Sequence, residues 1–519
     1  MTLTQWFVFF LIVQVVHFAG TWKLYEAAGR KRWEAAVPIY NAIVLMKIIN
    51  RPGWWTILLF VPIVNLIMFP VIWVETLRSF GKNSTSDTLL GIFTLGFYIY
   101  YVNYTQPLNH IPDRELRSSS KAGDTLSSLL FAVIVATVVH TYIMQPFTIP
   151  TSSLEKSLLI GDFLFVSKFH YGARTPSTTI ALPMVHDTIP VLNKRSYLFK
   201  PQLPSFRFPG FEKIEKNDIV VFNWPVDTVE RFFVPGPRVN KPIDKKSNYV
   251  KRCVGTPGDS LSIVNGDVVI NGKKLILPER ARPQMAYFVT FDGKTPIDFE
   301  YLLRSLDVTD GAGFISERRD TLLISAITER GVEALRKVPG VVSVTKNIEP
   351  KDKRKSSVVF PKGYTDWTLD NYGPIYIPEQ GKSVALNRAS LPFYKKIIAE
   401  FEGHDLKVNG DEIRIDGKVA TSYTFAQNYY WMMGDNRHRS EDSRYWGFVP
   451  ENHVVGKPVF IWMSLDPNKG GFEKIRWERM FTTVGGDGEP VSYFKFFLIA
   501  LGIYFVASYF INKRKATQE

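Results

Sequence analysis

Long apolar runs near both ends of the chain predict helices that cross a membrane. A helix that spans the hydrocarbon layer needs about 20 mostly apolar residues. Five segments approach this length: Leu3–Gly20, Trp54–Val74, Thr88–Tyr104, Thr125–Met144 and Val491–Ile511. A sixth segment, Val37–Ile49, is shorter and contains a proline, an asparagine and a lysine, so we expect it to lie at the membrane interface or to re-enter the membrane.

The positions of Lys and Arg predict how these segments are oriented. Basic residues are concentrated at residues 23–51, 114–121 and 513–515, whereas only Arg78 and Lys82 lie between the second and third apolar runs. Short loops rich in Lys and Arg stay on the cytoplasmic side. All three clusters are cytoplasmic if the N-terminus is outside and four spans precede residue 146. The region from about 147 to 490 is then extracytoplasmic.

The region between the apolar ends has the pattern of a β-rich domain. Asp218–Trp224 and Leu261–Ile270 mix β-branched with other apolar residues, and Asn-Gly pairs mark hairpin turns. Val264–Lys273 recurs loosely as Val408–Lys418, either as an internal repeat or by chance convergence on common hairpin chemistry. Between these copies, Leu322–Ile348 predicts a strand, a helix and a second strand. We therefore expect a mainly β domain that carries a small α+β insertion.

Composition and charge narrow the partners. The 519 residues carry a formal net charge of +14, which suits either nucleic acid or anionic lipid. No basic tract accompanies a nucleic-acid motif, so we expect anionic lipid and no nucleic acid. The single cysteine, Cys253, excludes an intrachain disulfide. The eight histidines lack ligand spacing, so we expect no metal and no cofactor.

Three segments dense in polar residues are the candidates for chemistry. They are Gln145–Lys168 (QPFTIPTSSLEKSLLIGDFLFVSK), Asn248–Asp259 (NYVKRCVGTPGD) and Met432–Pro450 (MMGDNRHRSEDSRYWGFVP). The serine-rich turn of the first segment means little alone, whereas the third segment is unusually dense in polar groups bounded by aromatic residues. Together, in this order and with Asn217–Pro225 (NDIVVFNWP), they resemble the signature segments of bacterial type I signal peptidases, or leader peptidases, of peptidase family S26.

The resemblance implies a catalytic domain of the signal-peptidase/LexA-like β fold. It also implies a membrane-bound serine endopeptidase that removes N-terminal signal peptides from exported preproteins. The chain then divides as follows: a multi-span membrane region at 1–124, an anchor at 125–146, the catalytic domain at 147–280 and 401–485, the α+β insertion at 281–400, and a terminal helix at 491–511. We expect the protein in the inner membrane with its catalytic domain outside, and possible contact with the secretion machinery.

A Ser–Lys dyad is the chemistry that the resemblance implies. A serine hydroxyl is a weak nucleophile and needs a base. Lysine serves only when neutral, and burial lowers its pKa from about 10.4 by several units. By position in the motifs, Ser153 is the nucleophile and Lys251 the general base. Ser440 matches the hydroxyl that orients the lysine, and Thr151 matches the side-chain donor of the oxyanion hole.

Other positions match the family's supporting and substrate-binding residues. The expected ion-pair network, catalytic or purely structural, consists of Arg252, Asp435, Asp442 and Arg444. The expected substrate pockets, or alternatively ordinary β-core, consist of Phe147, Ile149, Pro150, Leu154, Leu158, Tyr249 and Val250. These pockets would favour small residues at the cleavage site.

One segment departs from the family. A proline usual after the nucleophile is absent from Leu154-Glu155-Lys156-Ser157, and we expect Glu155 and Lys156 to face solvent.

Three alternatives remain. A catalytically weak homologue could bind signal peptides or act as a membrane platform. A self-cleaving Ser–Lys regulator is disfavoured by the membrane spans. A Ser/His/Asp triad through His438 and Asp435 would make Lys251 redundant.

Overall fold

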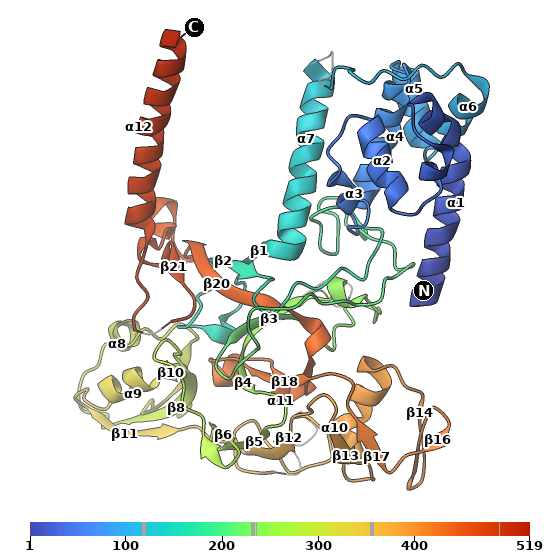
Figure 1. Ribbon diagram of the computed structural model, residues 1–519. Coiled ribbons are helices and arrows are strands. Elements are labelled where there is room, and N and C mark those ends of the chain that lie inside the picture. Colours follow the sequence, from blue (N-terminus) through green and yellow to red (C-terminus); the bar gives the residue numbers. More distant parts are fainter. Residues whose placement is uncertain (117–120, 230–233, 235, 353–357, 487, 519) are drawn as a thin grey trace. The chain divides into compact units, whose positions relative to one another are not determined.

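The computed structural model describes residues 1–116, 121–229, 234, 236–352, 358–486 and 488–518. It divides into two compact units (Figure 1). The helical unit comprises Met1–Ile143, Arg174–Phe208 and Pro235–Lys246. The β unit comprises Met144–Ala173, Pro209–Val234 and Ser247–Glu519.

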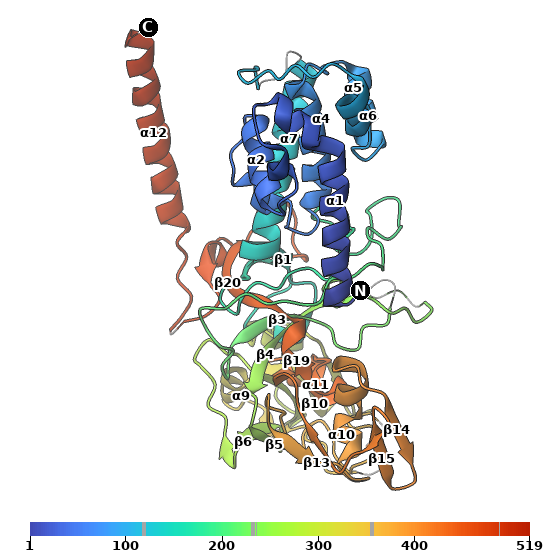
Figure 2. The same cartoon turned by 45° about the vertical axis from the view of Figure 1, so that its right-hand side comes forward.

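The helical unit gathers seven helices from the first part of the chain (Figure 2). They are α1 (Leu3–Ala27), α2 (Tyr40–Ile48), α3 (Trp55–Leu58), α4 (Asn65–Ser79), α5 (Thr85–Phe93), α6 (Tyr98–Thr105) and α7 (Lys121–Val138), which continues as a π-helical turn to Ile143. Leu24, Val44, Met68, Leu77 and Val102 form part of its apolar core. The two loops 174–208 and 235–246 from later in the chain join this unit.

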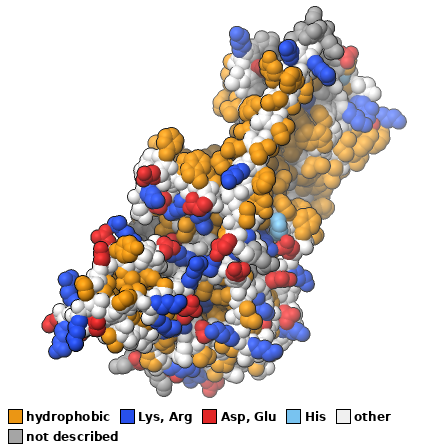
Figure 3. Space-filling model, turned by 90° about the vertical axis from the view of Figure 1, so that its left-hand side faces the viewer, with side chains coloured by type: hydrophobic (Ala, Val, Ile, Leu, Met, Phe, Trp, Pro, Cys, Tyr) orange, Lys and Arg blue, Asp and Glu red, His pale blue; other side chains and the backbone are white. Residues whose placement is uncertain are grey.

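Among the described residues, three helices are long and apolar enough to cross a membrane: Leu3–Ala27, Lys121–Ile143 and Phe494–Arg514. The last is part of α12 (Phe494–Gln518). They coincide with the first, fourth and fifth spans expected from the sequence. Apolar side chains cover the helical parts in Figure 3, whereas charged side chains are frequent on the surface of the β-sheet part.

The other two expected spans are wrong as continuous helices. Trp54–Val74 is split into α3 and α4, because the chain turns at Pro62 and Ile63, whose φ is +70°. Thr88–Tyr104 is split into α5 and α6 at Leu95 and Gly96, both with positive φ. Their apolar side chains, such as Met68 and Ile99, are buried against neighbouring helices. Helix α2 has nine residues, which is too short to cross a membrane.

The β unit is built on an eight-stranded antiparallel sheet, so the expected mainly β fold is confirmed. Its main path has the order β1-β2-β20-β3-β4-β18-β19, and β21 pairs with β20. The strands are β1 (Met144–Thr148), β2 (Asp162–Ser167), β3 (Ile219–Asn223), β4 (Asn248–Gly255), β18 (Tyr429–Met433), β19 (Val449–Pro450), β20 (Val454–Ser464) and β21 (Thr482–Thr483). The strand expected at Asp218–Trp224 is the central strand β3.

A second sheet continues from the first. It has the order β12-β5-β6-β7, formed by β12 (Tyr372–Tyr376), β5 (Ser260–Val264), β6 (Asp267–Ile270) and β7 (Lys273–Lys274). The loosely similar segment forms a separate three-stranded sheet of β14 (Leu406–Asn409), β15 (Glu412–Ile415) and β16 (Lys418–Val419). Both copies are therefore three-stranded antiparallel meanders. Positive φ at Asn265 and Gly266 shows why an Asn-Gly pair occupies the turn between β5 and β6.

The expected strand–helix–strand segment is present and belongs to a small α+β sheet. It consists of β10 (Thr321–Thr328), α9 (Glu329–Leu335) and β11 (Val341–Lys346). Both strands pair with β8 (Gln284–Phe291), and β9 (Ala312–Phe314) and helix α8 (Phe299–Ser305) complete it. Residues after this sheet, including Trp367, Ile377 and Ile398, pack into the same core as Leu261 of β5 and Trp431 of β18.

The remaining described β-strands and α-helices are short. They are β13 (Ser383–Ala385) paired with β17 (Ser422–Thr424), and the helices α10 (Leu391–Lys396) and α11 (Ser443–Trp446).

Candidate active site

Ser153 lies in a tight turn directly after the edge strand β1. Strand β1 pairs with β2, and Ile149 continues this pairing through its N–H to Asp162 O (2.9 Å) and its carbonyl, which accepts from Gly161 N (2.9 Å). A single 3₁₀ turn follows at Ser152–Leu154. Ser153 is only 6% exposed, and Leu154 is buried in the apolar cluster beneath the turn. The strand pair and the buried leucine thus fix the position of the hydroxyl.

Lys251 is on β4, an interior strand of the sheet, and reaches the same hydroxyl. β4 is flanked by β3 and β18, which leaves Lys251 3% exposed. Its Nζ lies 2.7 Å from Ser153 Oγ and 3.1 Å from Val250 O. Burial lowers its pKa to about 8, although Asp442, Glu441 and Asp435 act in the opposite direction. A substantial fraction of Lys251 is therefore neutral near pH 8 and able to accept a proton.

Arg252, the next residue on β4, has a separate partner. Its Nε and Nη2 donate to the two carboxylate oxygens of Asp435 at 2.8 and 2.6 Å. The hydroxyl of Ser157 also donates to Asp435 at 2.5 Å. Burial works against the charged carboxylate, but these partners hold the pKa of Asp435 below its usual value. This bidentate pair joins β4 to the segment after β18 and, through Ser157, to the nucleophile turn.

A second bidentate pair stiffens the segment after β18. Arg444 donates from Nε and Nη2 to Asp442 at 2.9 and 2.8 Å, and the Gly434 N–H donates to the same carboxylate at 3.1 Å. Arg444 Nη2 also donates to Arg437 O at 2.5 Å. All four expected network residues are thus in two separate buried ion pairs, each bracing backbone near the dyad and neither touching Ser153 Oγ.

Gly434 is required by close packing between the two halves of the site. A Cβ at this position would lie 2.3 Å from Ser440 Oγ and 2.4 Å from Ser153 O. Only glycine allows the segment after β18 to approach the nucleophile turn so closely. The neighbouring Asn436 closes the contact, because its N–H donates to Ser153 O at 3.1 Å and its Nδ2 to Ser152 O at 3.2 Å.

Ser440 and Thr151 lie at the site, but in this state neither is bonded to Lys251. Ser440 is 4% exposed, and its hydroxyl helps to keep the pKa of Asp442 low. It forms no hydrogen bond of ordinary geometry with the described residues. Thr151 is half-buried in an extended conformation, and its side chain caps no described group. Its hydroxyl is therefore available to an incoming ligand.

The expected substrate-pocket residues fall into two groups. Ile149, Leu154 and Leu158 are at most 3% exposed and belong to an apolar cluster beneath the turn, as the β-core alternative requires. The accessible group is Phe147, Pro150, Tyr249 and Val250, of which Phe147 and Val250 pack on that cluster. The Tyr249 ring centroid lies 5.1 Å from Lys251 Nζ, and its OH donates to Glu441 at 3.2 Å.

The turn after Ser153 is buried, so the expectation that Glu155 and Lys156 face solvent is wrong. Glu155 is 7% exposed, and burial raises the pKa of its carboxyl group. Its carbonyl accepts from Gln284 Nε2 at 3.1 Å. The Lys156 side chain is 12% exposed and pairs with Asp307 at 2.8 Å. Contacts from the insertion, which cannot be anticipated from the local sequence, cover this turn.

Three residues that sequence reasoning missed hold the nucleophile turn: Ser157, Gln284 and Asn436. Asn436 lies inside the recognised GDNR sequence and could have been noticed there. Ser157 stands in the segment that departs from the family, and Gln284 lies outside every motif.

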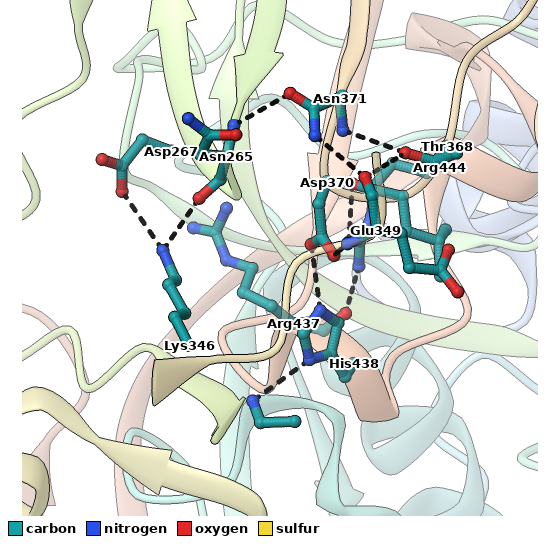
Figure 4. Close-up of polar contacts among 12 residues, drawn as sticks. Asn265, Asp267, Lys346, Glu349, Thr368, Asp370, Asn371, Arg437, His438 and Arg444 are labelled. Carbon is teal, nitrogen blue, oxygen red and sulfur yellow. Dashed lines mark hydrogen bonds and ion pairs between the residues drawn. The ribbon is translucent and has the colours of Figure 1, made fainter. Parts of the chain in front are cut away.

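His438 is not part of a serine triad. Its Nδ1 accepts from Ala286 N at 3.1 Å, so Nε2 carries the proton and donates to Asp370 at 2.9 Å (Figure 4). Both ring nitrogens are therefore occupied by bonds to residues of the insertion. This geometry excludes the triad alternative through His438.

A serine hydroxyl in contact with a buried amine of lowered pKa, on an antiparallel β scaffold in a chain with membrane-spanning helices, defines a candidate membrane-bound serine hydrolase. The comparisons with known proteins specify the family. Residues 122–318 and 419–463 match the family described as signal peptidase, peptidase S26. This match supports a type I signal peptidase. Residues 33–111 match a separate family of unknown function.

Similar proteins cover most of the chain. A signal peptidase I of Haemophilus influenzae is 26% identical over 375 residues, which are 70% of this chain and 76% of the relative. One from Buchnera aphidicola is 26% identical over 349 residues (66% and 75%), and one from Rickettsia typhi is 24% identical over 366 residues (70% and 86%).

Proposed function

We propose that this protein is a membrane-bound serine endopeptidase that cleaves signal peptides from exported preproteins. The observation that carries the proposal is the 2.7 Å contact between Ser153 Oγ and Lys251 Nζ, both buried and 98 residues apart in the chain. The lowered pKa of Lys251 supplies the base that a serine nucleophile needs. The similarity to signal peptidases supplies the substrate class.

The geometry supports a two-step acyl transfer. Neutral Lys251 takes the hydroxyl proton as Ser153 Oγ attacks the scissile carbonyl. The oxyanion that forms is stabilised by the Ser153 N–H and the Thr151 hydroxyl. The Lys251 ammonium then gives its proton to the leaving amine, so the peptide C–N bond breaks and an ester remains. Water, deprotonated by Lys251, attacks this ester; Ser153 regains its proton, and the signal peptide leaves with a free carboxylate.

An extended substrate segment fits the edge of the main sheet. Strand β1 ends the described strand order, so its outer edge has no strand partner among the described residues. A peptide can pair with such an edge through main-chain hydrogen bonds. Of the expected pocket residues, Phe147, Pro150 and Val250 are accessible enough to contact its side chains. The three fully buried ones would shape the pocket from behind.

We propose an orientation with the β unit outside the cytoplasmic membrane. If α1 and α7 are the two spans before residue 146, Arg30, Lys47, Arg78 and Arg114 all lie between them and can be cytoplasmic together. The basic residues at 513–515 lie at the C-terminal end of the third span, on the same side. Two crossings before residue 147 leave it on the same side of the membrane as four crossings would. The proposed orientation is therefore the same as the one expected from the sequence, although two of the expected spans are absent.

Anionic lipid is the second proposed partner. The net charge of +14 favours an anionic surface. Phe206, Phe208 and Phe211 are 55%, 45% and 82% exposed, as suits residues that dip into the interface.

The decisive experiment is cleavage of a purified preprotein by the full chain in detergent, with Ser153→Ala as the matched inactive variant. Cleavage after a small residue by the wild type alone supports the proposal. If the wild type is as inert as Ser153→Ala while both bind the signal peptide, the protein is a binding homologue and the enzyme proposal fails.

A further inference from the structure

A cavity of about 120 Å³ lies beside the site described above but does not include the dyad. It opens between the β5–β6–β7 meander, the start of β8 and the turn that follows Asn436. Val268, Leu275, Met285 and Ile327 form apolar walls. Arg437 is the buried charged residue of its lining.

Arg437 is unusual because its charge has no local partner. The residue is 5% exposed, and its Nε is buried without a hydrogen-bond partner. Within the described ranges, no carboxylate forms an ion pair with its guanidinium. The two nearby acids form ion pairs with other residues, Asp435 with Arg252 and Asp442 with Arg444. Burial lowers the pKa of Arg437 to about 10, so it is still protonated at neutral pH.

The mouth of the cavity does not supply the missing negative charge. Asp267 is 2.7 Å from Lys274 and 3.9 Å from Lys346, so two lysines face it. Glu329 is exposed and accepts from Tyr287 OH at 3.0 Å. Figure 4 shows the Arg437 side chain extending toward the hairpin of Asn265 and Asp267, whereas the neighbouring His438 turns to Asp370. A buried arginine without a counter-charge is energetically unfavourable, so a complementary anion would be favoured.

The lining specifies which anion fits. One unmatched positive charge suits one negative charge, and apolar walls suit hydrocarbon. A carboxylate can accept two parallel bonds from a guanidinium. Phosphate carries more charge than one arginine offers and no apolar part for the walls.

We propose that this cavity binds a carboxylate borne on a short apolar body, with the carboxylate on Arg437 and the apolar part against Val268 and Met285. Two sources share this chemistry: a free short-chain acid, and the C-terminal carboxylate of a peptide that ends in alanine. The second source, a released signal peptide, rests on the proposed function. Arg437 directly follows Asn436, whose N–H donates to Ser153 O. A carboxylate bound to Arg437 would therefore contact the backbone segment that positions the nucleophile turn.

Calorimetric titration of the full-length chain in detergent tests the site. All proteins carry Ser153→Ala, so that binding is measured without turnover. The probes are butyrate, Ala-Ala-Ala with a free C-terminus, and the same peptide with an amidated C-terminus. We expect at least one acid to bind and the amide to bind at least tenfold more weakly.

Two variants address the cavity by different routes. Arg437→Gln removes the charge, and Val268→Phe fills the space while keeping Arg437. Both should weaken binding of the acid at least tenfold. Arg439→Gln, an exposed arginine of the same turn that does not line the cavity, is the matched control and should bind normally. Thermal unfolding confirms that each variant is folded. Arg437→Gln should be at least as stable as its parent, because it removes an unmatched buried charge.

The pattern of binding separates the sources. Butyrate alone supports a free acid, and the free-acid peptide alone supports a peptide end. The proposal is overturned if neither acid binds, if the amide binds as well as the acid, or if Arg437→Gln and Val268→Phe bind normally. Because these proteins cannot turn over substrate, failure of the wild type to cleave a preprotein would refute the proposed function and leave this result standing.

Discussion

The sharpest test of the dyad is the pH dependence of cleavage. The reaction requires neutral Lys251, whose pKa burial lowers to about 8. The rate must therefore rise as this amine loses its proton. Below its pKa, kcat/KM should increase tenfold per pH unit, and above it the profile should level.

The expected magnitude follows from the titration of one group. With a pKa of about 8, about one tenth of Lys251 is neutral at pH 7 and about nine tenths at pH 9. The value of kcat/KM should thus rise about tenfold between these pH values. An unperturbed lysine, with a pKa of about 10.4, would give a rise of about a hundredfold over the same range with no plateau.

Glu441 provides a perturbation that leaves the dyad intact. It is exposed, and its charge is one of those that raise the pKa of Lys251. Glu441→Gln should therefore move the pH profile toward lower pH without abolishing activity. Glu412→Gln, an exposed acid on β15 paired with Arg414, is the matched control and should leave the profile unchanged.

The assay measures initial rates on a preprotein with alanine at the cleavage site, between pH 6 and 10 in one detergent and at constant ionic strength. A flat profile from pH 6 to 9 would refute Lys251 as the base. So would a profile that moved equally in Glu441→Gln and Glu412→Gln, because the local charge would then have no specific effect.

Four further substitutions, at three positions, test the geometry. Lys251→Arg and Lys251→Met should both abolish cleavage, the first because arginine stays protonated. Lys251→Met also removes a buried amine whose pKa is lowered, so it should raise the free energy of unfolding at pH 7 by up to about 3 kcal/mol, measured by denaturant titration. Because the pKa of Lys251 is lower in the folded state, its burial destabilises the wild type fully below pH 8, and this destabilisation disappears as pH rises toward 10.5. A stability difference between Lys251→Met and wild type that grew with pH would contradict this reasoning. Gly434→Ala should destabilise by about 1–3 kcal/mol and reduce kcat, because its Cβ would meet Ser153 O and Ser440 Oγ; a fully active, equally stable variant would contradict the packing. Asp435→Asn should destabilise by about 3–5 kcal/mol in thermal unfolding because Arg252 loses its charged partner, and a change below 1 kcal/mol would show the pair to be dispensable.

The sheet and its turns could be predicted because their signals are local. A run of β-branched and other apolar residues marked β3, and Asn265-Gly266 marked a turn that needs positive φ at both residues. The candidate dyad was reached in a different way. Nothing near Ser153 or Lys251 alone indicates that their side chains meet, and only the ordered set of motifs brought them together.

The membrane region shows where local patterns fail. An apolar sequence indicates that its side chains are shielded from water, but it does not indicate whether lipid or another helix shields them. Met68 and Ile99 face neighbouring helices, in segments as apolar as a span. Pro62, inside the second apolar run, was a usable warning, since proline lacks the N–H that continues a helix. The break at Leu95 and Gly96 left no comparable signal.

The turn after Ser153 shows how a missing local constraint is replaced by distant ones. Without the family's proline, Leu154-Glu155-Lys156-Ser157 has no residue that restricts its backbone, and Lys156 adopts a left-handed φ of +71°. The structure restrains this turn from both sides. Ser157 is bonded to Asp435 and receives the Arg282 N–H at 3.0 Å, while Gln284 holds the Glu155 carbonyl.

Arg282 and Gln284 stand where the chain enters the insertion, so this segment is a structural part of the nucleophile turn. Gln284→Ala removes the hydrogen bond to the Glu155 carbonyl and leaves both dyad residues unchanged. It should therefore lower kcat with little change in the pH profile, whereas an unchanged kcat would show that the turn is rigid without it.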